Sequence, residues 1–373
     1  MDLKNGPLGP VKASSVSNGW DRVDSLLELK GSWNSFLLAS STPDFFRSWE
    51  WLEAWLAVFG AGKRPCILAY FDRDGLAGLA PLCITSFLGL ERITFLGAGV
   101  SDRHGFIVRP GKEDAFARGL PQALDQYTGW QLCDLQELPE DDPVSQRLQG
   151  VLPSPKKRVS LQSKLPYLTL PATWEEFLGG YGKKRRDKIK YYPRMLGRDH
   201  RWSIEEANQE NLPGRLNALA SLNVRRWLRK GIPSSFLQPG FRLFHARAAK
   251  AMLGGALRLY TLLVDGQPGA ILYGYSFGRR FSFYLCAQDD QFSRYGLGFI
   301  LQVEAIRRAI EEDCLIFDFL KGLEDYKMHW KPQVAVNQRL LLRRGGWESG
   351  IGASLIWAEH QLVQGIKRKA KRI

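Results

Sequence analysis

The sequence predicts an α/β (α+β) protein made of two tandem domains, each a mixed, mostly antiparallel sheet flanked by helices. Apolar runs with strand character follow one another through tight turns, which is typical of antiparallel pairing. Segments with apolar residues at helical spacing stand before and after these runs. The hairpin pattern of residues 66–84 also returns at 259–276. Two copies of one α/β unit explain this echo, although any two β-hairpins share such a pattern.

Length and composition agree with this class. The chain has 373 residues, 45% of them hydrophobic and 12% aromatic, enough for two globular domains. No run approaches the ~18 apolar residues of a membrane span, and the first residues lack the pattern of a secretory signal. The five cysteines are scattered without a CxxC spacing. We therefore expect reduced, buried thiols in a cytoplasmic protein, with no disulfide framework and no zinc site.

The net charge of +14, with a pI near 9.6, favours a polyanionic neighbour. Nucleic acid, an anionic membrane and a phosphate-bearing cofactor all fit, and the charge alone does not choose among them. The alternative is the ordinary background of a basic proteome.

The elements of the first half can be placed in order. Apolar runs on either side of Arg-Asp-Gly predict a hairpin over 65–84. Around it the patterns predict a helix over 45–60, a strand over 92–99, a helix over 112–127 and a strand over 130–138. Residues 139–165 are rich in Pro, Ser and charge, so we place the domain junction there.

In the second half, Thr173 predicts a helix N-cap, with Glu176 completing a capping box. The helical pattern then continues through the basic segment that follows. Asp265-Gly266 and Gly278-Arg279 divide 257–288 into three antiparallel strands. The remaining patterns predict helices over 212–231, 241–253 and 298–312 and strands over 315–322 and 338–344.

These elements give the predicted domain organisation. We expect residues 1–20 to be disordered, 21–150 to form the N-terminal domain and 151–350 the C-terminal domain. Residues 351–373 combine apolar residues at helical spacing with Lys and Arg, which predicts a basic amphipathic C-terminal helix.

Residues 294–299, RYGLGF, join a predicted strand to a predicted helix. Glycines let a ligand approach the backbone closely, and the first N–H groups of a helix carry the positive end of its dipole. A pyrophosphate fits such a turn. The other interpretation is an ordinary strand-to-helix turn with two glycines.

The element order around this turn resembles the GNAT acyltransferase superfamily, in which the turn holds the pyrophosphate of acyl-CoA with a Q/R-x-x-G-x-G/A pattern. Gly296 and Gly298 align with that pattern, whereas Ser293 replaces its leading residue and Arg294 stands one place later. The resemblance implies two GNAT-like domains and acyl-CoA or acetyl-CoA as co-substrate. It implies a cofactor-binding set of Arg294, Tyr295, Gly296, Leu297 and Gly298.

The chain more closely resembles CelD-like acetyltransferases, bacterial proteins associated with cellulose and exopolysaccharide synthesis, and more distantly Fem-type peptidyltransferases. The most specific shared pattern is FDFLKGLEDYKMHWKP at 317–332. The other shared marks are Trp51, Trp55, Phe59-Gly60, Pro81-Leu82, Leu96-Gly97, Ser101-Asp102, Arg226-Trp227, Lys230-Gly231 and Gly296. The resemblance covers roughly 43–345 and implies a role in polysaccharide biosynthesis.

Asp318 lies in an apolar strand pattern, where a carboxylate is unfavourable unless it is paired or used. Burial would raise its pKa, which suits a general base acting on an amine or hydroxyl. The alternative is a structural Asp satisfied by Arg or backbone donors. The resemblance implies Tyr326 as general acid, with core packing as its alternative. Lys327 completes the catalytic set, either binding phosphate or pairing with Asp318.

The substrate-binding set is Asp102, Arg226, Trp227, Tyr284 and Trp330. The resemblance places Asp102 near the acceptor, at the cleft between the halves, and assigns Arg226 to an acceptor phosphate or carboxylate. A solvated helix end is the other account of Arg226. No Ser-His-Asp arrangement, Walker motif or metal-ligand spacing occurs, so no metal is expected.

Two basic stretches, residues 183–201 and the C-terminal segment, each allow more than one kind of binding partner. Residues 183–201 hold nine Lys and Arg with interleaved tyrosines, a pattern that binds nucleic acid or forms a solvated helix face. Because Fem-type relatives use aminoacyl-tRNA as donor, tRNA is an alternative partner. The C-terminal helix suits either peripheral contact with the inner membrane face or packing on the domain.

The resulting hypothesis is an N- or O-acyltransferase. It would move an acyl group from a thioester, expected to be acyl-CoA, to an amine or hydroxyl of a sugar, an envelope precursor or another small molecule. A Fem-type aminoacyl-tRNA-dependent transferase and a catalytically degenerate GNAT scaffold are its rivals. The acceptor, the acyl chain length and the oligomeric state are left open by the sequence.

Overall fold

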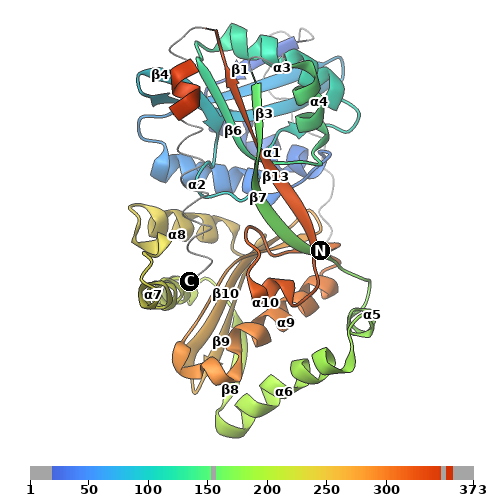
Figure 1. The fold of residues 1–373 in the computed structure, drawn as a ribbon, viewed down its shortest axis with the longest axis vertical. Coiled ribbons are helices and arrows are strands. Elements are labelled where there is room, and N and C mark those ends of the chain that lie inside the picture. Colours follow the sequence, from blue (N-terminus) through green and yellow to red (C-terminus); the bar gives the residue numbers. More distant parts are fainter. Residues whose placement is uncertain (1–18, 153–156, 346–349, 356–373) are drawn as a thin grey trace. The chain divides into compact units, whose positions relative to one another are not determined.

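A computed structural model of the chain describes residues 19–152, 157–345 and 350–355 (Figure 1). These residues fall into two compact units. Unit 1 is built from the chain up to Leu52, from Gly60–Ser163 and from Val336 onward, and unit 2 from Glu53–Phe59 and Lys164–Ala335. Each unit contains a mixed, mostly antiparallel sheet flanked by helices. The predicted fold class is confirmed.

The sheet of unit 1 has the strand order β1-β2-β3-β4-β6-β13, with β5 paired to β3. All of these pairs are antiparallel except β4 with β6. The strands are β1 (Gly19–Val23), β2 (Arg64–Asp72), β3 (Gly75–Phe87), β4 (Leu90–Phe95), β5 (Ile107–Val108), β6 (Leu132–Pro139) and β13 (Gln333–Arg343). The helices are α1 (Lys30–Leu38), α3 (Glu113–Tyr127) and α4 (Pro143–Val151), with short 3-10 turns η1 (Leu26–Leu29) and η2 (Phe45–Arg47). Helix α2 (Trp49–Phe59) contributes residues to both units.

The sheet of unit 2 has the strand order β7-β12-β11-β10-β9-β8, antiparallel except for β11 with β12. Strands β7 and β13 each contribute residues to both units. The strands are β7 (Lys157–Thr169), β8 (Trp202–Glu206), β9 (Leu257–Val264), β10 (Gln267–Phe277), β11 (Arg280–Gln288) and β12 (Ile316–Asp318). The helices are α5 (Trp174–Gly179), α6 (Lys183–Asp199), α7 (Leu212–Arg229), α8 (Phe241–Met252), α9 (Leu297–Glu311) and α10 (Asp325–Met328), with 3-10 turns η4 (Ser235–Leu237) and η5 (Asp290–Tyr295).

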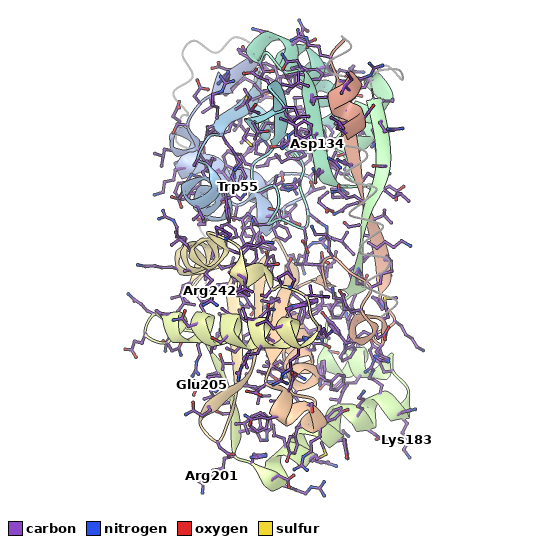
Figure 2. All side chains as sticks on the ribbon, turned by 60° about the vertical axis from the view of Figure 1, so that its left-hand side comes forward. Trp55, Asp134, Lys183, Arg201, Glu205 and Arg242 are labelled. Carbon is purple, nitrogen blue, oxygen red and sulfur yellow. The ribbon has the colours of Figure 1, made fainter. Side chains whose placement is uncertain are left out.

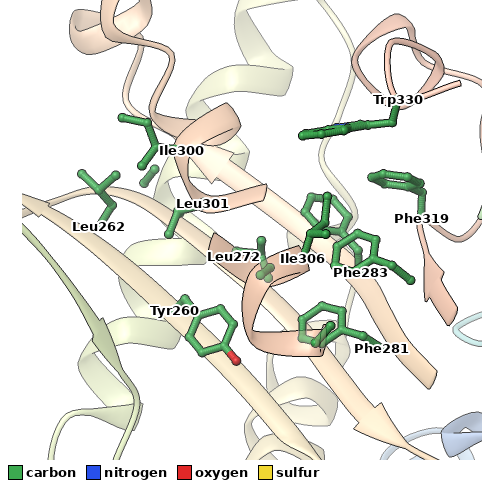
Figure 3. Close-up of a cluster of buried hydrophobic side chains, with 14 of the residues drawn as sticks. Tyr260, Leu262, Leu272, Phe281, Phe283, Ile300, Leu301, Ile306, Phe319 and Trp330 are labelled. Carbon is green, nitrogen blue, oxygen red and sulfur yellow. The ribbon is translucent and has the colours of Figure 1, made fainter. Parts of the chain in front are cut away.

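Helix α9 covers one face of the unit 2 sheet. Its apolar residues Ile300, Leu301 and Ile306 pack on Leu272 and Phe281 in one buried cluster (Figure 3). Full burial of each such side chain contributes about 1.5–3 kcal/mol. Helix α7 contacts β10 and β11. Since successive strand residues point to opposite faces, the tyrosines that alternate with this cluster along β10 lie on the other face. The core therefore fixes where α9 begins relative to β11.

The local signals of the sequence predicted most of these elements correctly. The hairpins and the three strands of 257–288 are confirmed, with the turns at the expected glycines. The Thr173 cap is also confirmed, because its hydroxyl accepts the N–H of Glu176 at 3.2 Å. Residues Gly19 and Trp20 already belong to β1, so the disorder expected through residue 20 is wrong for these two.

Three boundaries differ from the prediction. The expected junction over 139–165 contains α4 and the start of β7, since Asp142 caps α4 and Pro143 opens it. The chain passes from unit 1 to unit 2 between Ser163 and Lys164, whereas the expected boundary between the domains follows residue 150. Strand β12 ends at Asp318, four residues before the predicted end at 322, because Leu320 adopts a positive φ of 57°.

Two predicted segments concern residues that the structure does not cover in full. Residues 1–18 and 356–373 lie outside the described residues, so most of the segment predicted to be disordered and most of the predicted C-terminal helix are not described. Within 19–152, 157–345 and 350–355, no helix is long and apolar enough to cross a bilayer. The same ranges hold no cluster of three or more metal-ligating side chains.

The two units share an element order. Unit 1 runs through the antiparallel strands β2-β3-β4, helix α3, and strand β6 parallel to β4. Unit 2 runs through the antiparallel strands β9-β10-β11, helix α9, and strand β12 parallel to β11. This correspondence supports the interpretation of the sequence echo as two copies of one α/β unit.

Candidate functional site

The parallel strands β11 and β12 separate after three residue pairs. Residues 280–282 pair with 316–318, and from there β11 continues to Gln288 on its partner β10. The chain after β12 turns instead to β7, where the Phe319 N–H donates to the Pro166 carbonyl at 2.9 Å. Among the described residues, no strand pairs beyond Ser282 with the edge of β11 that lies opposite β10. This edge can hydrogen-bond an extended ligand.

A β-bulge lies where the strands separate. Phe283 pairs with Gly274 and Leu285 with Tyr273, so Tyr284 is the extra residue on β11. A bulge bends its strand and re-aims side chains, which is common beside active sites. The Tyr284 ring packs 5.2 Å from the ring of His245 and 5.8 Å from that of Tyr273. Burial lowers the pKa of His245 to about 3, so this imidazole is neutral. Tyr284 thus faces α8, on the side of the sheet away from α9.

The glycine turn at the start of α9 is held by the protein's own packing. Gly296 adopts a left-handed conformation with φ 62° and caps α9, and a Cβ there would lie 3.0 Å from the Tyr192 ring. A Cβ on Gly298 would lie 2.9 Å from Oε1 of Gln288. The Gly298 N–H donates to that same oxygen at 2.8 Å. One of the first amides of α9 is therefore already bonded within the chain.

The other three residues predicted for cofactor binding have structural contacts. Arg294 pairs with Asp199 at 3.1 Å. The Tyr295 hydroxyl donates to the same carboxylate at 2.7 Å. Tyr295 and Leu297 are buried in the core of unit 2. The backbone of the turn and the exposed guanidinium of Arg294 are thus what the turn offers to a ligand.

Asp318 stands at the point where β11 and β12 part and is fully buried. Its Oδ2 accepts from Arg280 at 3.0 Å, and its Oδ1 accepts the Leu320 N–H at 2.9 Å. These contacts match the structural interpretation of Asp318, an Asp satisfied by Arg and a backbone donor. They also explain the early end of β12, because the Leu320 N–H turns back to the side chain. The role of general base stays a prediction.

Tyr326 of α10 lies beside β11. Its ring centroid is 6.3 Å from that of Phe283. Burial raises the pKa of the Tyr326 hydroxyl, and the nearby Glu324 and Cys286 raise it further, while Arg226 lowers it. The hydroxyl is therefore protonated at neutral pH, in the vicinity of the β11 edge. This is the protonation state that a general acid needs.

The remaining residues predicted around Tyr326 are buried. The Lys327 ammonium donates to the Lys321 carbonyl at 2.7 Å and pairs with Glu324 at 2.9 Å, so it secures the loop before α10. The Trp330 indole N–H donates to Gln302 at 3.1 Å, and its ring stacks on Phe299. Lys327 does not pair with Asp318, because Glu324 and backbone carbonyls take its ammonium. Trp330 has the contacts of a core residue.

Arg226 reaches β11 from α7. Its Nη1 donates to the Cys286 carbonyl at 3.5 Å. Burial raises the pKa of the Cys286 thiol to about 12, so the thiol is neutral and unreactive. Trp227, the next residue, has the Lys230 ammonium 5.4 Å from its ring centroid. The structure thus brings Arg226, Cys286 and Tyr326 together on β11 beyond the bulge.

Sequence reasoning missed Cys286 and Gln288. Both lie on β11 two residues apart, so they share the face against which α9 begins, and the Cβ position of Gly298 is near both. The sequence signal for them was the strand pattern itself, because residues 286 and 288 of a strand point to the same face of the sheet. Only the position of α9 shows that Gln288 caps the glycine turn.

Asp102 belongs to unit 1, whereas the other predicted site residues belong to unit 2. Its carbonyl accepts from Asn337 of β13 at 2.7 Å. In the same segment, the His104 N–H donates to the Glu137 carbonyl of β6 at 2.9 Å. The parallel strands β4 and β6 pair only at residues 92–93 with 132–133. The edge of β6 beyond that pair is therefore covered by the chain itself, whereas among the described residues no strand pairs with the corresponding edge of β11 in unit 2.

A family model matches the part of the chain that contains the candidate site. Residues 183–328 match the family model of the acetyltransferase (GNAT) domain. This range lies within unit 2 and includes the β11–β12 opening and the glycine turn. No curated protein sequence matches the chain.

Solved structures share the fold over most of the chain. FemX is 11% identical with a TM-score of 0.63, covering 86% of this chain and 96% of FemX. The C-terminal domain of a protein described as a lysylphosphatidylglycerol synthetase, from Agrobacterium fabrum, is 11% identical with a TM-score of 0.56, covering 90% of this chain and 96% of that chain. L-PGS from Bacillus licheniformis is 14% identical with a TM-score of 0.51, covering 84% and 96%. At these identities the likeness shows the fold alone.

Proposed function

We propose that the chain is a GNAT-type acyltransferase that works at the β11–β12 opening of unit 2. It moves an acyl group from a thioester, with acyl-CoA as the expected donor, to an amine or hydroxyl of a small acceptor. The observation that carries this proposal is the backbone edge of β11 beyond Ser282, beside the start of α9, with which no strand pairs among the described residues. The GNAT match over 183–328 supports it.

The donor arm would bind as an added strand. The pantetheine part of an acyl thioester carries two amides, which can exchange hydrogen bonds with the N–H and C=O groups of 283–288 as a β-strand does. Phosphates of the donor would then lie toward the turn of Gly296 and Gly298, near the positive end of α9. The thioester carbonyl would lie near the bulge, where Tyr284 interrupts the regular pairing.

Transfer breaks the C–S bond and forms a C–N or C–O bond. The acceptor nitrogen or oxygen attacks the thioester carbonyl, and its own N–H or O–H proton passes to solvent. The leaving thiolate takes a proton from Tyr326, which regains one from solvent. Tyr326 is the residue we assign as proton donor, because its ring lies beside Phe283 of β11 and a tyrosine hydroxyl carries its proton at neutral pH. Asp318, held by Arg280 and Leu320, positions β12 in this proposal.

The acceptor class follows from the resemblance to CelD-like proteins, which favours a sugar or an envelope precursor. The proposal is tested by following thiol release from acetyl-CoA and longer acyl-CoAs against a panel of amino sugars, sugars and amino acids. We expect turnover by the wild type and a loss of about 10²-fold or more in kcat for Tyr326→Phe, with donor affinity retained. Absence of both binding and turnover with every thioester would refute the proposal.

A further inference from the structure

Helix α6 carries a strong positive charge that is not neutralised. Its 17 residues include eight Lys and Arg and two Asp. Among the described residues, no carboxylate lies within ion-pair distance of any of these eight side chains. Five of the exposed ones follow at intervals of three or four residues, which places them on one side of the helix: Lys183, Arg186, Lys190, Arg194 and Arg198. Figure 2 shows Lys183 at the start of the helix and Arg201 just beyond its end.

Exposed arginines of helices α7 and α9 have carboxylate partners. Arg225 and Arg229 of α7 pair with Asp289 and Asp290, at 3.2 and 2.5 Å. Arg307 of α9 pairs with Glu304 at 2.9 Å. The cations of α6 therefore differ from the arginines of α7 and α9, most of which have carboxylate partners.

The inner side of α6 rests on the start of α9. Tyr192 closes over Gly296. The Lys188 ammonium lies 5.3 Å from the Phe299 ring centroid, and the Arg185 guanidinium 4.5 Å from that of Trp330. The apolar residues of α6 pack into the core of unit 2. The cationic side of the helix is thus held rigidly next to the proposed entrance for the donor.

Two of the groups that the glycine turn could offer to a pyrophosphate already have partners within the chain. Gln288 takes the Gly298 N–H, and Asp199 takes Arg294. Positive charge is instead spread along α6, over about 25 Å at 1.5 Å per residue. Such a surface is longer than the phosphates of one small donor and fits a macromolecule.

We propose that α6 is the docking surface for an acidic protein that delivers the acyl group as a thioester on a phosphopantetheine arm. This inference rests on the proposed transfer from a thioester. The arm would be the same chemical group as the reactive part of acyl-CoA, so the β11 edge would serve both. The carrier's own carboxylates would face the cations on the outer side of α6, which favours encounter and orientation.

An acidic protein fits this surface better than nucleic acid does. Single-stranded nucleic acid is held by aromatic side chains on which successive bases stack. On α6 only Tyr191 is exposed, because Tyr192 packs against Gly296.

The test measures binding of a fluorescently labelled acyl carrier protein, loaded with an acetyl group, by anisotropy at low and moderate salt. The variant is Arg186→Glu, Lys190→Glu and Arg194→Glu together. The control is Arg118→Glu, Arg147→Glu and Lys250→Glu, which changes the net charge equally on exposed positions of other helices. We expect the α6 variant to lose at least tenfold in affinity and the control less than threefold. Equal losses in both would overturn the docking assignment.

A second arm separates this inference from the proposed function. Turnover is measured with acetyl-CoA and with the acetylated carrier as donors. We expect the α6 variant to lose activity with the carrier and to keep it with acetyl-CoA, while its thermal unfolding stays unchanged. Equal loss with both donors would assign α6 to the nucleotide phosphates and overturn the inference alone. Tighter, α6-dependent binding of a short RNA hairpin than of the carrier would also overturn it. Wild-type inactivity with both donors would refute the proposed function.

Discussion

Replacing Arg280 by Met tests whether Asp318 is a structural or a chemical residue. The Asp318 carboxylate is fully buried, and Arg280, itself 24% exposed, is its cationic partner at 3.0 Å. Removing one partner of a buried pair costs about 3–5 kcal/mol, because the remaining charge stays buried. Since water reaches Arg280, we expect the lower value, about 3 kcal/mol. For a unit of this size that lowers the melting temperature by about 6–12 °C.

A double substitution separates the pair from other effects. In Arg280→Met with Asp318→Asn, both charges of this pair are removed, and the Asn oxygen can still accept the Leu320 N–H. We expect the double variant to recover most of the stability lost by Arg280→Met alone, measured by calorimetry and urea unfolding. A coupling energy near zero in this cycle would refute the structural account of the pair.

Kinetics decide the remaining question about Asp318. If Asp318 positions β12, the Asp318→Asn variant keeps turnover within about tenfold of the wild type once folded protein is counted. If Asp318 is a general base, kcat falls by about 10²–10⁴-fold while the melting temperature hardly moves. The second outcome would contradict our interpretation of its contacts and restore the prediction made from the sequence.

Three further predictions concern single residues. Tyr326→Phe should lower kcat by about 10²-fold or more while donor affinity, measured by calorimetric titration, changes little; equal kcat values would remove the acid assignment. Because burial lowers the pKa of His245 to about 3, unfolding takes up a proton between pH 3 and its ordinary value of 6.5. His245 should therefore favour folding fully above pH 6.5 and progressively less as the pH falls toward 3, by up to about 1.4 kcal/mol per pH unit. Urea unfolding of His245→Phe across this range should show a flatter acid limb, and an unchanged slope would contradict the burial of a neutral His245. Gly298→Ala should destabilise by about 1–3 kcal/mol, because its Cβ meets Gln288 at 2.9 Å, and a melting temperature equal to the wild type's would show that Gln288 simply moves away.

Local signals explain which parts of the fold could be predicted. Turn residues and period-two alternation located the hairpins and the strands of 257–288, and the Thr173 cap followed from one side chain. The pairing of β13 with β6 brings together segments about two hundred residues apart, and no local pattern reports it. Asp142-Pro143 did carry a helix-start signal, which the charge and proline content of 139–165 obscured.

The site was predictable in location more than in detail. The resemblance pointed to the glycine turn and to the segment after β12, and the structure brings Tyr326, Arg226 and β11 together there. The partner of Asp318 is Arg280, which lies 38 residues earlier in the chain, so the sequence left it unidentified. The cap from Gln288 depends on how α9 packs on β11, which only tertiary structure determines.

The central claim is that the edge of β11 beyond Ser282 binds the donor arm. Hydrogen–deuterium exchange with and without acetyl-CoA measures this most directly, because an added strand protects backbone amides. The account predicts slower exchange in 283–288 on addition of acetyl-CoA, in Tyr326→Phe as well as in the wild type, with 96–106 of unit 1 unchanged. Unchanged exchange in 283–288 under saturating acetyl-CoA, or protection confined to 96–106, would contradict it.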